Sequence, residues 1–206
     1  FKQINAPKIN FSNSVLEGYH YGDSILKELD FSRSDLTEAN FTGATLIGVD
    51  FSNTNLTEAD FTGTKFEKPN FEKANLTGAK LPKANLYKVN LTGAHLNDVD
   101  LTNAILNDAD LTKATLNDAD LTGAKLNGTI LIEAKLHNAN LTNTYSAEAN
   151  FNDANLREAN LTGANFMGAF LTGANLREAN LTGAKLAGAD LSFANLDGSN
   201  LTGANL

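Results

Sequence analysis

The sequence predicts an all-β solenoid built from stacked, four-sided coils. Every fifth residue from Phe11 to Leu206 is leucine or phenylalanine, with two exceptions, Tyr21 and Ser146. Two residues before each of these positions lies a small residue, most often alanine. Apolar positions therefore follow one another at alternating spacings of two and three along the whole chain.

This spacing decides which backbone can bury the apolar residues together. On an α-helix, at about 100° per residue, they would lie all round the cylinder, so no apolar face would form. On a plain strand, the alternation of two fails at every step of three. A chain that alternates in, out and in, and then turns a corner, satisfies both spacings. The pattern therefore predicts short strands joined by corners and stacked as coils.

The corners have their own glycine signature. Fifteen of the sixteen glycines lie two residues after the Leu/Phe position, and Gly22 is the exception. In a four-residue turn that begins at the Leu/Phe, this is the third position, where a type II turn requires a positive φ. Corners with Glu158 or Lys113 at this position are therefore expected to adopt another turn type.

Longer echoes indicate how many sides a coil has. DFSRSDLTEANFTGAT from Asp30 recurs as DFSNTNLTEADFTGTK from Asp50, and ANLREANLTGAN from Ala154 recurs as ANLREANLTGAK from Ala174. Phenylalanine also alternates with leucine from residue 31 to residue 71, except at Phe66, as expected when opposite walls carry the larger ring. Both observations favour four sides over three. About ten coils at roughly 4.8 Å each predict a rod on the order of 50 Å long.

The repeated units, such as ANLTG at 74–78, 159–163 and 179–183, resemble the pentapeptide-repeat family over essentially the whole chain. The resemblance implies a right-handed quadrilateral parallel β-helix, with the Leu/Phe and the preceding small residue pointing inwards. We expect a single domain over 1–206, with less regular coils in 1–30 and regular repeats in 31–206. Ser146 replaces an inward leucine, so we expect a local bulge or weak coil near 144–147.

Composition limits the other possibilities. The chain has no cysteine, which excludes disulfides and thiolate metal sites, and no apolar run approaches the roughly 18 residues of a membrane span. It begins at Phe1 without a signal-peptide pattern. A net charge of −8 argues against direct nucleic-acid binding. The compartment stays open, since these features fit the cytoplasm, the periplasm or the thylakoid lumen.

Paired aspartates form a candidate calcium site. With twenty residues per coil, two pairs stack at one corner: Asp98, Asp100, Asp118 and Asp120. Hard cations bind several carboxylate oxygens together. However, no glycine-rich calcium loop accompanies the pairs, so we favour solvated aspartates and no metal. The histidines lie too far apart in coil number to form a zinc site: His20, His95 and His137.

The same period of twenty residues places six acidic side chains on one edge of the solenoid, which we call the acidic edge: Glu38, Glu58, Asp98, Asp118, Glu158 and Glu178. Some members of the family resemble duplex DNA in shape and charge and act on type II topoisomerases. A DNA-mimicking regulator of gyrase is therefore the alternative function. Against it, Arg157 and Arg177 lie beside two of these glutamates, and Asn or Gly interrupts the row.

A cluster of lysines suggests an anion-binding patch: Lys65, Lys68, Lys73, Lys80, Lys83 and Lys88. Only Lys68 and Lys88 share an edge, and the others distribute around the coil. We therefore favour a solvated belt over a binding site.

Apolar residues in outward positions are the strongest interaction candidates: Ile105, Ile130, Tyr145 and Phe170. They occupy two neighbouring sides, each pair two coils apart, and could form an apolar strip for a protein partner. No catalytic arrangement, phosphate loop or cofactor motif is present. The sequence therefore predicts a non-catalytic scaffold, the repeat module of a larger protein, whose C-terminal coil without a cap could also support tail-to-tail self-association.

Overall fold

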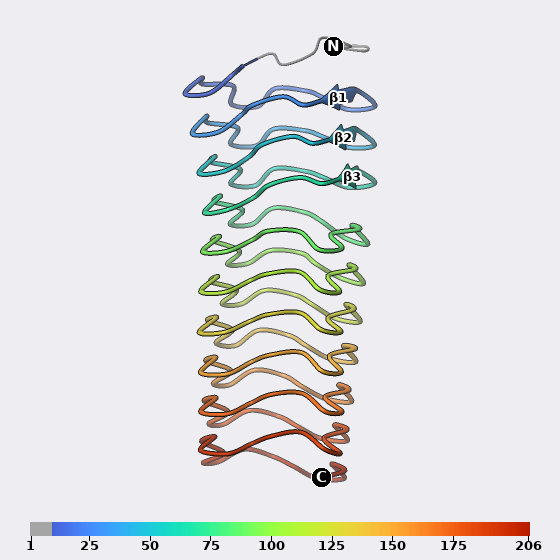
Figure 1. Cartoon of the computed structure of the whole chain (residues 1–206), viewed down its shortest axis with the longest axis vertical. Coiled ribbons are helices and arrows are strands. Elements are labelled where there is room, and N and C mark those ends of the chain that lie inside the picture. Colours follow the sequence, from blue (N-terminus) through green and yellow to red (C-terminus); the bar gives the residue numbers. More distant parts are fainter. Residues whose placement is uncertain (1–9) are drawn as a thin grey trace.

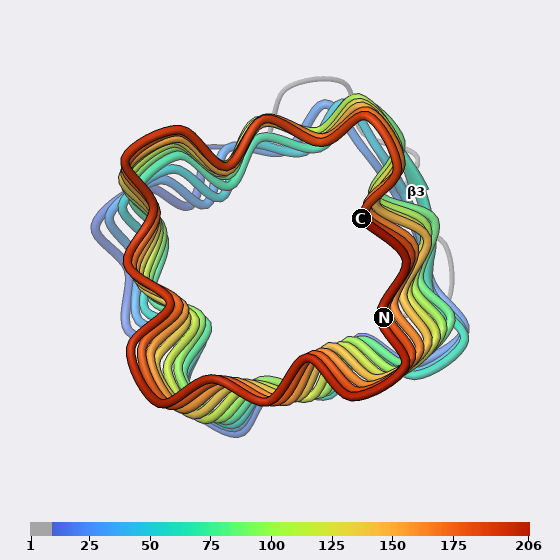
Figure 2. The ribbon, with the colours of Figure 1, turned by 90° about the horizontal axis from the view of Figure 1, so that it is seen from below.

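The computed structural model describes residues 10–206, and the first nine residues of the segment predicted to be less regular lie outside it. The chain winds into a tall stack of similar coils (Figure 1). Strands β1 (Ile25–Lys27), β2 (Thr45–Ile47) and β3 (Lys65–Glu67) form one parallel sheet in the order β1-β2-β3. Elsewhere single parallel bridges join each coil to the next, always between residues twenty apart. The view along the stack shows four sides, which confirms the predicted four-sided coil (Figure 2).

Each side has an outward residue at its middle, just before the inward Leu/Phe. We name the four faces after these residues: the 15-face, 20-face, 25-face and 30-face contain residues 15, 20, 25 and 30 and every twentieth residue after them. The chain passes through the faces in this order. The corner between the 25-face and the 30-face is therefore opposite the corner between the 15-face and the 20-face.

The core is a column of buried side chains from all four faces. Two stacks of rings rise from opposite sides in the N-terminal half of the column: Phe31 lies on Phe51 at 5.5 Å, and Phe41 lies on Phe61 at 4.8 Å. The stacks meet edge to face, with 6.5 Å between the centroids of Phe31 and Phe41. This arrangement confirms the alternation of large rings on opposite walls. Tyr21 continues the second stack, and its burial raises the pKa of the phenol to about 12.

The predicted difference between glycine and non-glycine corners is wrong. Every fifth residue from 13 to 203 has a positive φ, whether it is glycine or not. Glu158 and Lys113 both have φ of 60°, close to the 66° of Gly163. The amide of Glu158 donates to the carbonyl of Arg177 in the next coil at 3.0 Å, as the amide of Gly163 does to Thr182 at 2.9 Å. The bonds between coils therefore hold the same backbone at either residue type, at the cost of some strain.

The Asn/Asp and Thr residues of the repeat complete the backbone hydrogen bonding. The Asn160 Oδ1 accepts from the amide of Thr162 at 3.2 Å and from its hydroxyl at 2.6 Å. This amide has no backbone partner, so the side chain satisfies it. Amides also link consecutive coils, since the Asn75 Nδ2 donates to the Thr57 hydroxyl at 2.9 Å.

The bulge expected near 144–147 is absent from the backbone. The amide of Ser146 donates to the carbonyl of Asn165 at 2.8 Å, and Leu126 donates to Tyr145 at 2.6 Å, as in regular coils. The Ser146 side chain is fully buried, and its hydroxyl donates to that of Thr144 at 3.3 Å. A hydrogen-bonded partner thus allows a polar residue at this inward position without a change in the winding.

Candidate interaction surfaces

Exposed apolar side chains gather on one side of the solenoid. Residues 10–206 contain nine large hydrophobic side chains that are exposed. Five lie on the 25-face, the 30-face or the corner between them, and we call this set the apolar side: Tyr87, Ile130, Tyr145, Met167 and Phe170. The other four lie outside this set, so the apolar side is the candidate surface.

The four residues predicted to form an apolar strip lie on the faces expected from the period of twenty residues. Ile105 and Tyr145 lie on the 25-face with Lys125 between them, and Ile130 and Phe170 lie on the 30-face with Asn150 between them. Ile105 is half-buried, and Tyr145 and Phe170 are 53% and 48% exposed.

Sequence reasoning missed Met167 and Tyr87, which lie at the corner that joins these two faces. Met167 is 48% exposed and sits in the same coil as Phe170, one coil below Tyr145. The sequence signal was an apolar residue in a position of the repeat where threonine is the commonest residue. The densest part of the apolar side is therefore formed by Tyr145, Met167 and Phe170.

The acidic edge follows the opposite corner, between the 15-face and the 20-face. Glu58 packs over Gly78, and Asp118 accepts a hydrogen bond from Asn138 at 2.7 Å, so the column has uncharged gaps. Its C-terminal end is paired: the Arg157 guanidinium lies 2.8 Å from Glu158 and 3.5 Å from Glu178. Exposed pairs of this kind contribute little to stability, but they remove most of the local negative charge.

The aspartate pairs do not converge on one site. Asp98 and Asp118 lie at the corner, whereas Asp100 and Asp120 lie on the 20-face, where each accepts hydrogen bonds from the threonine two residues on. Within residues 10–206 no group of three or more His, Asp or Glu side chains is arranged to hold a metal ion. His137 is separate from the other histidines and bonds the carbonyl of Arg157 at 3.0 Å.

Apart from the open end at the last coil, the ladder of hydrogen bonds between coils is broken at one place in residues 10–206. Everywhere else in residues 10–206 the 25-face residues pair at intervals of twenty, but Lys65 and Asn85 do not. Five backbone amides that would donate hydrogen bonds across this junction, at consecutive positions of the ladder, have no backbone partner: Gly63, Phe66, Lys68, Asn85 and Asn90. Intact bonds flank it, from Phe61 to Lys80 at 2.9 Å and from Phe71 to Asn90 at 3.1 Å. We call this junction, residues 63–69 above and 82–90 below, the seam.

Crowding in the core accompanies the seam. The ring of Phe66 is added to a coil that already holds Phe61 and Phe71, at 5.6 and 5.8 Å from them, and it stays half-buried where its neighbours are fully buried. Pro69 replaces the usual small residue and has no amide to close the corner. Since an overfilled core displaces backbone, we infer that this third ring contributes to the break.

The seam also separates two forms of the same corner. No hydrogen bond closes the corners after β1 and β2, at Leu29 and Val49, whereas below the seam Val89 donates to the carbonyl of Leu86 at 3.2 Å. The coils above and below therefore present different backbone shapes to each other across the 25-face.

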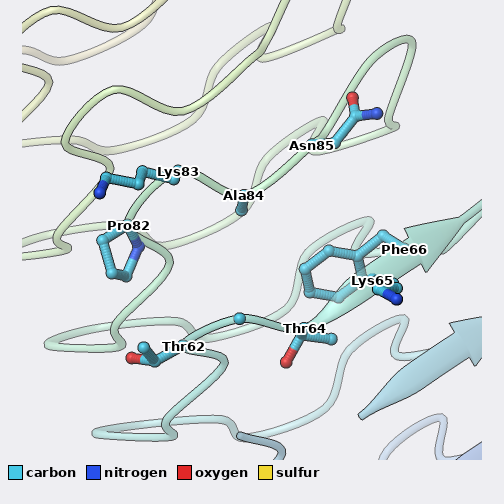
Figure 3. Close-up of a pocket in the computed structure, with 9 residues that line it drawn as sticks. Thr62, Thr64, Lys65, Phe66, Pro82, Lys83, Ala84 and Asn85 are labelled. Atoms are coloured by element: carbon cyan, nitrogen blue, oxygen red, sulfur yellow. The ribbon is translucent and has the colours of Figure 1, made fainter. Parts of the chain in front are cut away.

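The seam opens into a hollow of about 540 Å³ between the coils (Figure 3). Its lining includes Lys65 and Phe66 from above and Pro82, Lys83 and Asn85 from below. A smaller hollow of about 210 Å³ continues along the seam past Lys68, Pro69 and Tyr87, and shares Phe66 and Asn85 with the first. Lysines predicted to distribute around the coil are thus brought to one opening.

The fold and its surfaces define a quadrilateral parallel β-helix, a scaffold whose outward side chains vary on a constant core. The chain belongs to the pentapeptide repeat family, whose model matches in eight copies over 24–63, 70–108, 94–131, 104–143, 134–173 and 174–206. As in that family, the helix is right-handed.

Solved structures of pentapeptide repeat proteins are similar to this chain. HetL, involved in heterocyst differentiation regulation in the cyanobacterium Nostoc sp. strain PCC 7120, is 33% identical over 98% of this chain and 88% of its own, with a TM-score of 0.46. Full-length QnrB1, a plasmid-mediated fluoroquinolone resistance protein, is 17% identical over 97% and 93%, with a TM-score of 0.56. At this identity the likeness to QnrB1 shows the fold alone. No sequence among the curated proteins matches the chain.

Two further observations concern catalysis and membrane-spanning helices. Members of the family are generally non-catalytic. No helix within residues 10–206 is long and apolar enough to cross a membrane.

Proposed function

We propose that the chain is a non-catalytic scaffold that binds a protein partner through its apolar side. The observation that carries the proposal is the position of Tyr145, Met167 and Phe170 on two adjoining faces within two successive coils. Aromatic and methionine side chains are enriched in protein interfaces, where a few of them supply most of the binding energy. Ala147 and Ala187, at the same corner, are small, and Glu148 beside Gly168 is charged.

The rigidity of the scaffold supports this use. Each coil is bonded to its neighbours on all faces away from the seam, so the outward side chains keep a fixed spacing of about 4.8 Å per coil. A surface of this kind loses little backbone entropy on binding.

Site-specific cross-linking tests the proposal. A photoreactive amino acid is placed at position 170 on the apolar side and, as a control, at position 157 on the opposite corner. We expect a partner to cross-link in host cells from position 170 only. The same partner should be lost in Tyr145→Ser/Met167→Ser/Phe170→Ser, with affinity reduced at least about tenfold because anchors contribute 1–2 kcal/mol or more each.

A matched triple variant on the other side, Lys135→Ser/Arg157→Ser/Arg177→Ser, should retain the partner. Equal capture from both positions, or full retention by the apolar-side variant, would exclude the proposal.

A DNA-mimicking regulator of gyrase is the second candidate, favoured by the acidic column on the corner of the 15-face and 20-face. Its charge is sparse, since at most one carboxylate occurs per coil of about 4.8 Å, against one phosphate per about 1.7 Å of duplex. The arginine pairs reduce it further. A gyrase supercoiling assay decides: inhibition that is lost in Glu38→Gln/Glu58→Gln/Asp98→Asn/Asp118→Asn would support this function, and no effect at micromolar protein would remove it.

Tail-to-tail self-association remains a separate prediction. Light scattering of the purified protein over a range of concentrations tests it, since a dimer doubles the mass expected from a 21.9 kDa chain.

A further inference from the structure

The seam leaves strand-edge hydrogen-bonding groups open to solvent. On its upper side, the amides of Phe66 in β3 and of Lys68 just after it have no backbone partner, and the carbonyl of Thr64 lacks the donor it would have in a regular coil. On its lower side, the amides of Asn85 and Asn90 are also without a backbone partner. An unpaired strand edge is a template for another extended chain.

Positive charge predominates around the opening. Lys65 and Lys83 line the larger hollow, which contains no acidic residue, and Lys68 lines the smaller one beside a single acid, Glu67. None of these three lysines forms an ion pair with any residue in 10–206. In a chain of net charge −8, three unpaired lysines at one opening favour an anionic ligand.

The walls also offer apolar contact. The half-buried ring of Phe66 and the ring of Pro82 face the larger hollow (Figure 3). Tyr87 borders the smaller one. Tyr87 is held by Lys88, whose ammonium lies 5.0 Å from the centre of the ring and whose pKa is raised by a hydrogen bond to the Tyr87 side chain. A ligand that fits must therefore combine a hydrogen-bonding backbone, apolar side chains and negative charge.

From these features we infer that the seam binds a short, extended, acidic segment of a protein partner. The segment pairs with the free edge of β3 and places its carboxylates near Lys65 and Lys83. The bonds that close the seam at Phe61 and Phe71 limit the paired length, which is on the order of five residues at about 3.3 Å each. This site is independent of the apolar patch formed by Tyr145, Met167 and Phe170, which lies several coils away.

The direct test uses fluorescein-labelled hexapeptides and the purified chain. One peptide alternates valine and glutamate, a second alternates valine and lysine, and a third is the acidic peptide with alternate backbone amides N-methylated. We expect the acidic peptide to bind with a Kd on the order of 100 μM, as befits a short strand with few anchors. The lysine peptide and the N-methylated peptide should bind at least tenfold more weakly.

Protein variants locate the site. Lys65→Glu/Lys83→Glu should weaken binding of the acidic peptide at least tenfold. Phe66→Leu/Pro69→Ala, which restores the repeat and is designed to close the seam, should abolish it, whereas Lys125→Glu/Lys185→Glu, on the same face away from the seam, should bind as the wild type does. Circular dichroism checks the fold of each variant, and the N-methylated peptide tests pairing on the unaltered protein.

Three results would overturn the inference. These are no binding of the acidic peptide at millimolar concentration, equal binding of the N-methylated peptide, and undiminished binding by the closed variant. Displacement of the peptide by 10-fold excess inorganic phosphate, with phosphate itself binding as tightly, would identify a simple anion pocket instead.

Discussion

The amide of Phe66 does not reach the carbonyl of Asn85, although every equivalent pair of residues nineteen apart along the 25-face, from Leu86 with Ile105 to Leu186 with Asn205, is hydrogen-bonded. A single extra phenyl ring inside one coil therefore coincides with a break in an otherwise continuous ladder. The consequence is local because the bonds from Phe61 and Phe71 hold the two coils together on either side. The solenoid thus carries an opening in its wall without a change in its winding.

Closing the seam should stabilise the protein. In Phe66→Leu/Pro69→Ala the smaller residues relieve the crowding and supply an amide at position 69, so we expect the free energy of unfolding to rise by about 1–3 kcal/mol. Urea denaturation measures the change, and slower hydrogen exchange at Gly63 and Asn85 would report the restored bonds. The control is Phe166→Leu, which removes a fully buried ring from an unbroken wall and should lose about 1 kcal/mol. A loss in both variants would contradict the crowding explanation.

Corner residues offer a second test, because a positive φ is strained for side chains other than glycine. Phe193 has φ of 59° and is 93% exposed, so its bulky side chain gains little packing for this strain. We expect Phe193→Gly to raise the free energy of unfolding by about 1 kcal/mol. Gly183→Ala should lower it by about 1 kcal/mol, and since a Cβ there meets no atom within 4 Å, this loss measures backbone strain alone. Calorimetry of both variants provides the comparison.

The seam and the corners show how far the sequence specified the structure. The spacing of Leu, Phe and Ala determined which residues face inward, and the echoes over twenty residues determined the number of sides. The corner at Glu158 was predicted wrongly because turn propensity is a local property, whereas its φ is imposed by a bond to the next coil. Phe66 was recognised as an interruption of the ring pattern, but whether a coil accommodates a third ring or opens depends on packing in three dimensions.

The candidate surfaces follow the same division. Tyr145 and Phe170 could be placed from the sequence, since their register fixes their faces. The seam could not, because the sequence does not show that the backbone bonds between the coils of Lys65 and Lys83 are missing. Both lysines line the hollow that lies at this break.

The Asn/Asp position should contribute to stability through its cap. Asn75 accepts from the amide and hydroxyl of Thr77 at 3.2 and 2.7 Å, and donates to Asn55 and Thr57 in the coil above. Asn75→Ala should therefore lose about 1–3 kcal/mol, measured by urea denaturation, because it leaves a backbone amide unsatisfied. Asn75→Asp, which keeps the acceptor, should lose less.

Lys125 provides the matched control for this cap. It occupies the same place in the repeat and caps no amide, so Lys125→Ala should change stability by less than about 0.5 kcal/mol. Equal losses at the two positions would show that the cap is unimportant.

Acid should weaken one of these caps in a predictable range. The Thr37 hydroxyl and amide donate to the Asp35 Oδ1 at 2.6 and 3.1 Å, and these bonds lower the pKa of the carboxyl below its ordinary value of 3.8. A carboxylate with a lowered pKa stabilises the folded state above that ordinary value, and the contribution is lost as the pH falls through the lowered pKa.

Substitutions at Asp35 and Thr37 test this acid dependence. Asp35→Asn keeps an acceptor but cannot titrate, so the melting temperature of this variant should fall less than that of the wild type below about pH 4. Thr37→Val should raise the pKa of Asp35, measured by carboxyl NMR titration, because it removes the donor hydroxyl. Thr37→Ser should leave that pKa close to the wild-type value, since it retains the hydroxyl. A pKa that is the same in the wild type and both Thr37 variants would show that the hydrogen bond from Thr37 does not control the ionisation of Asp35.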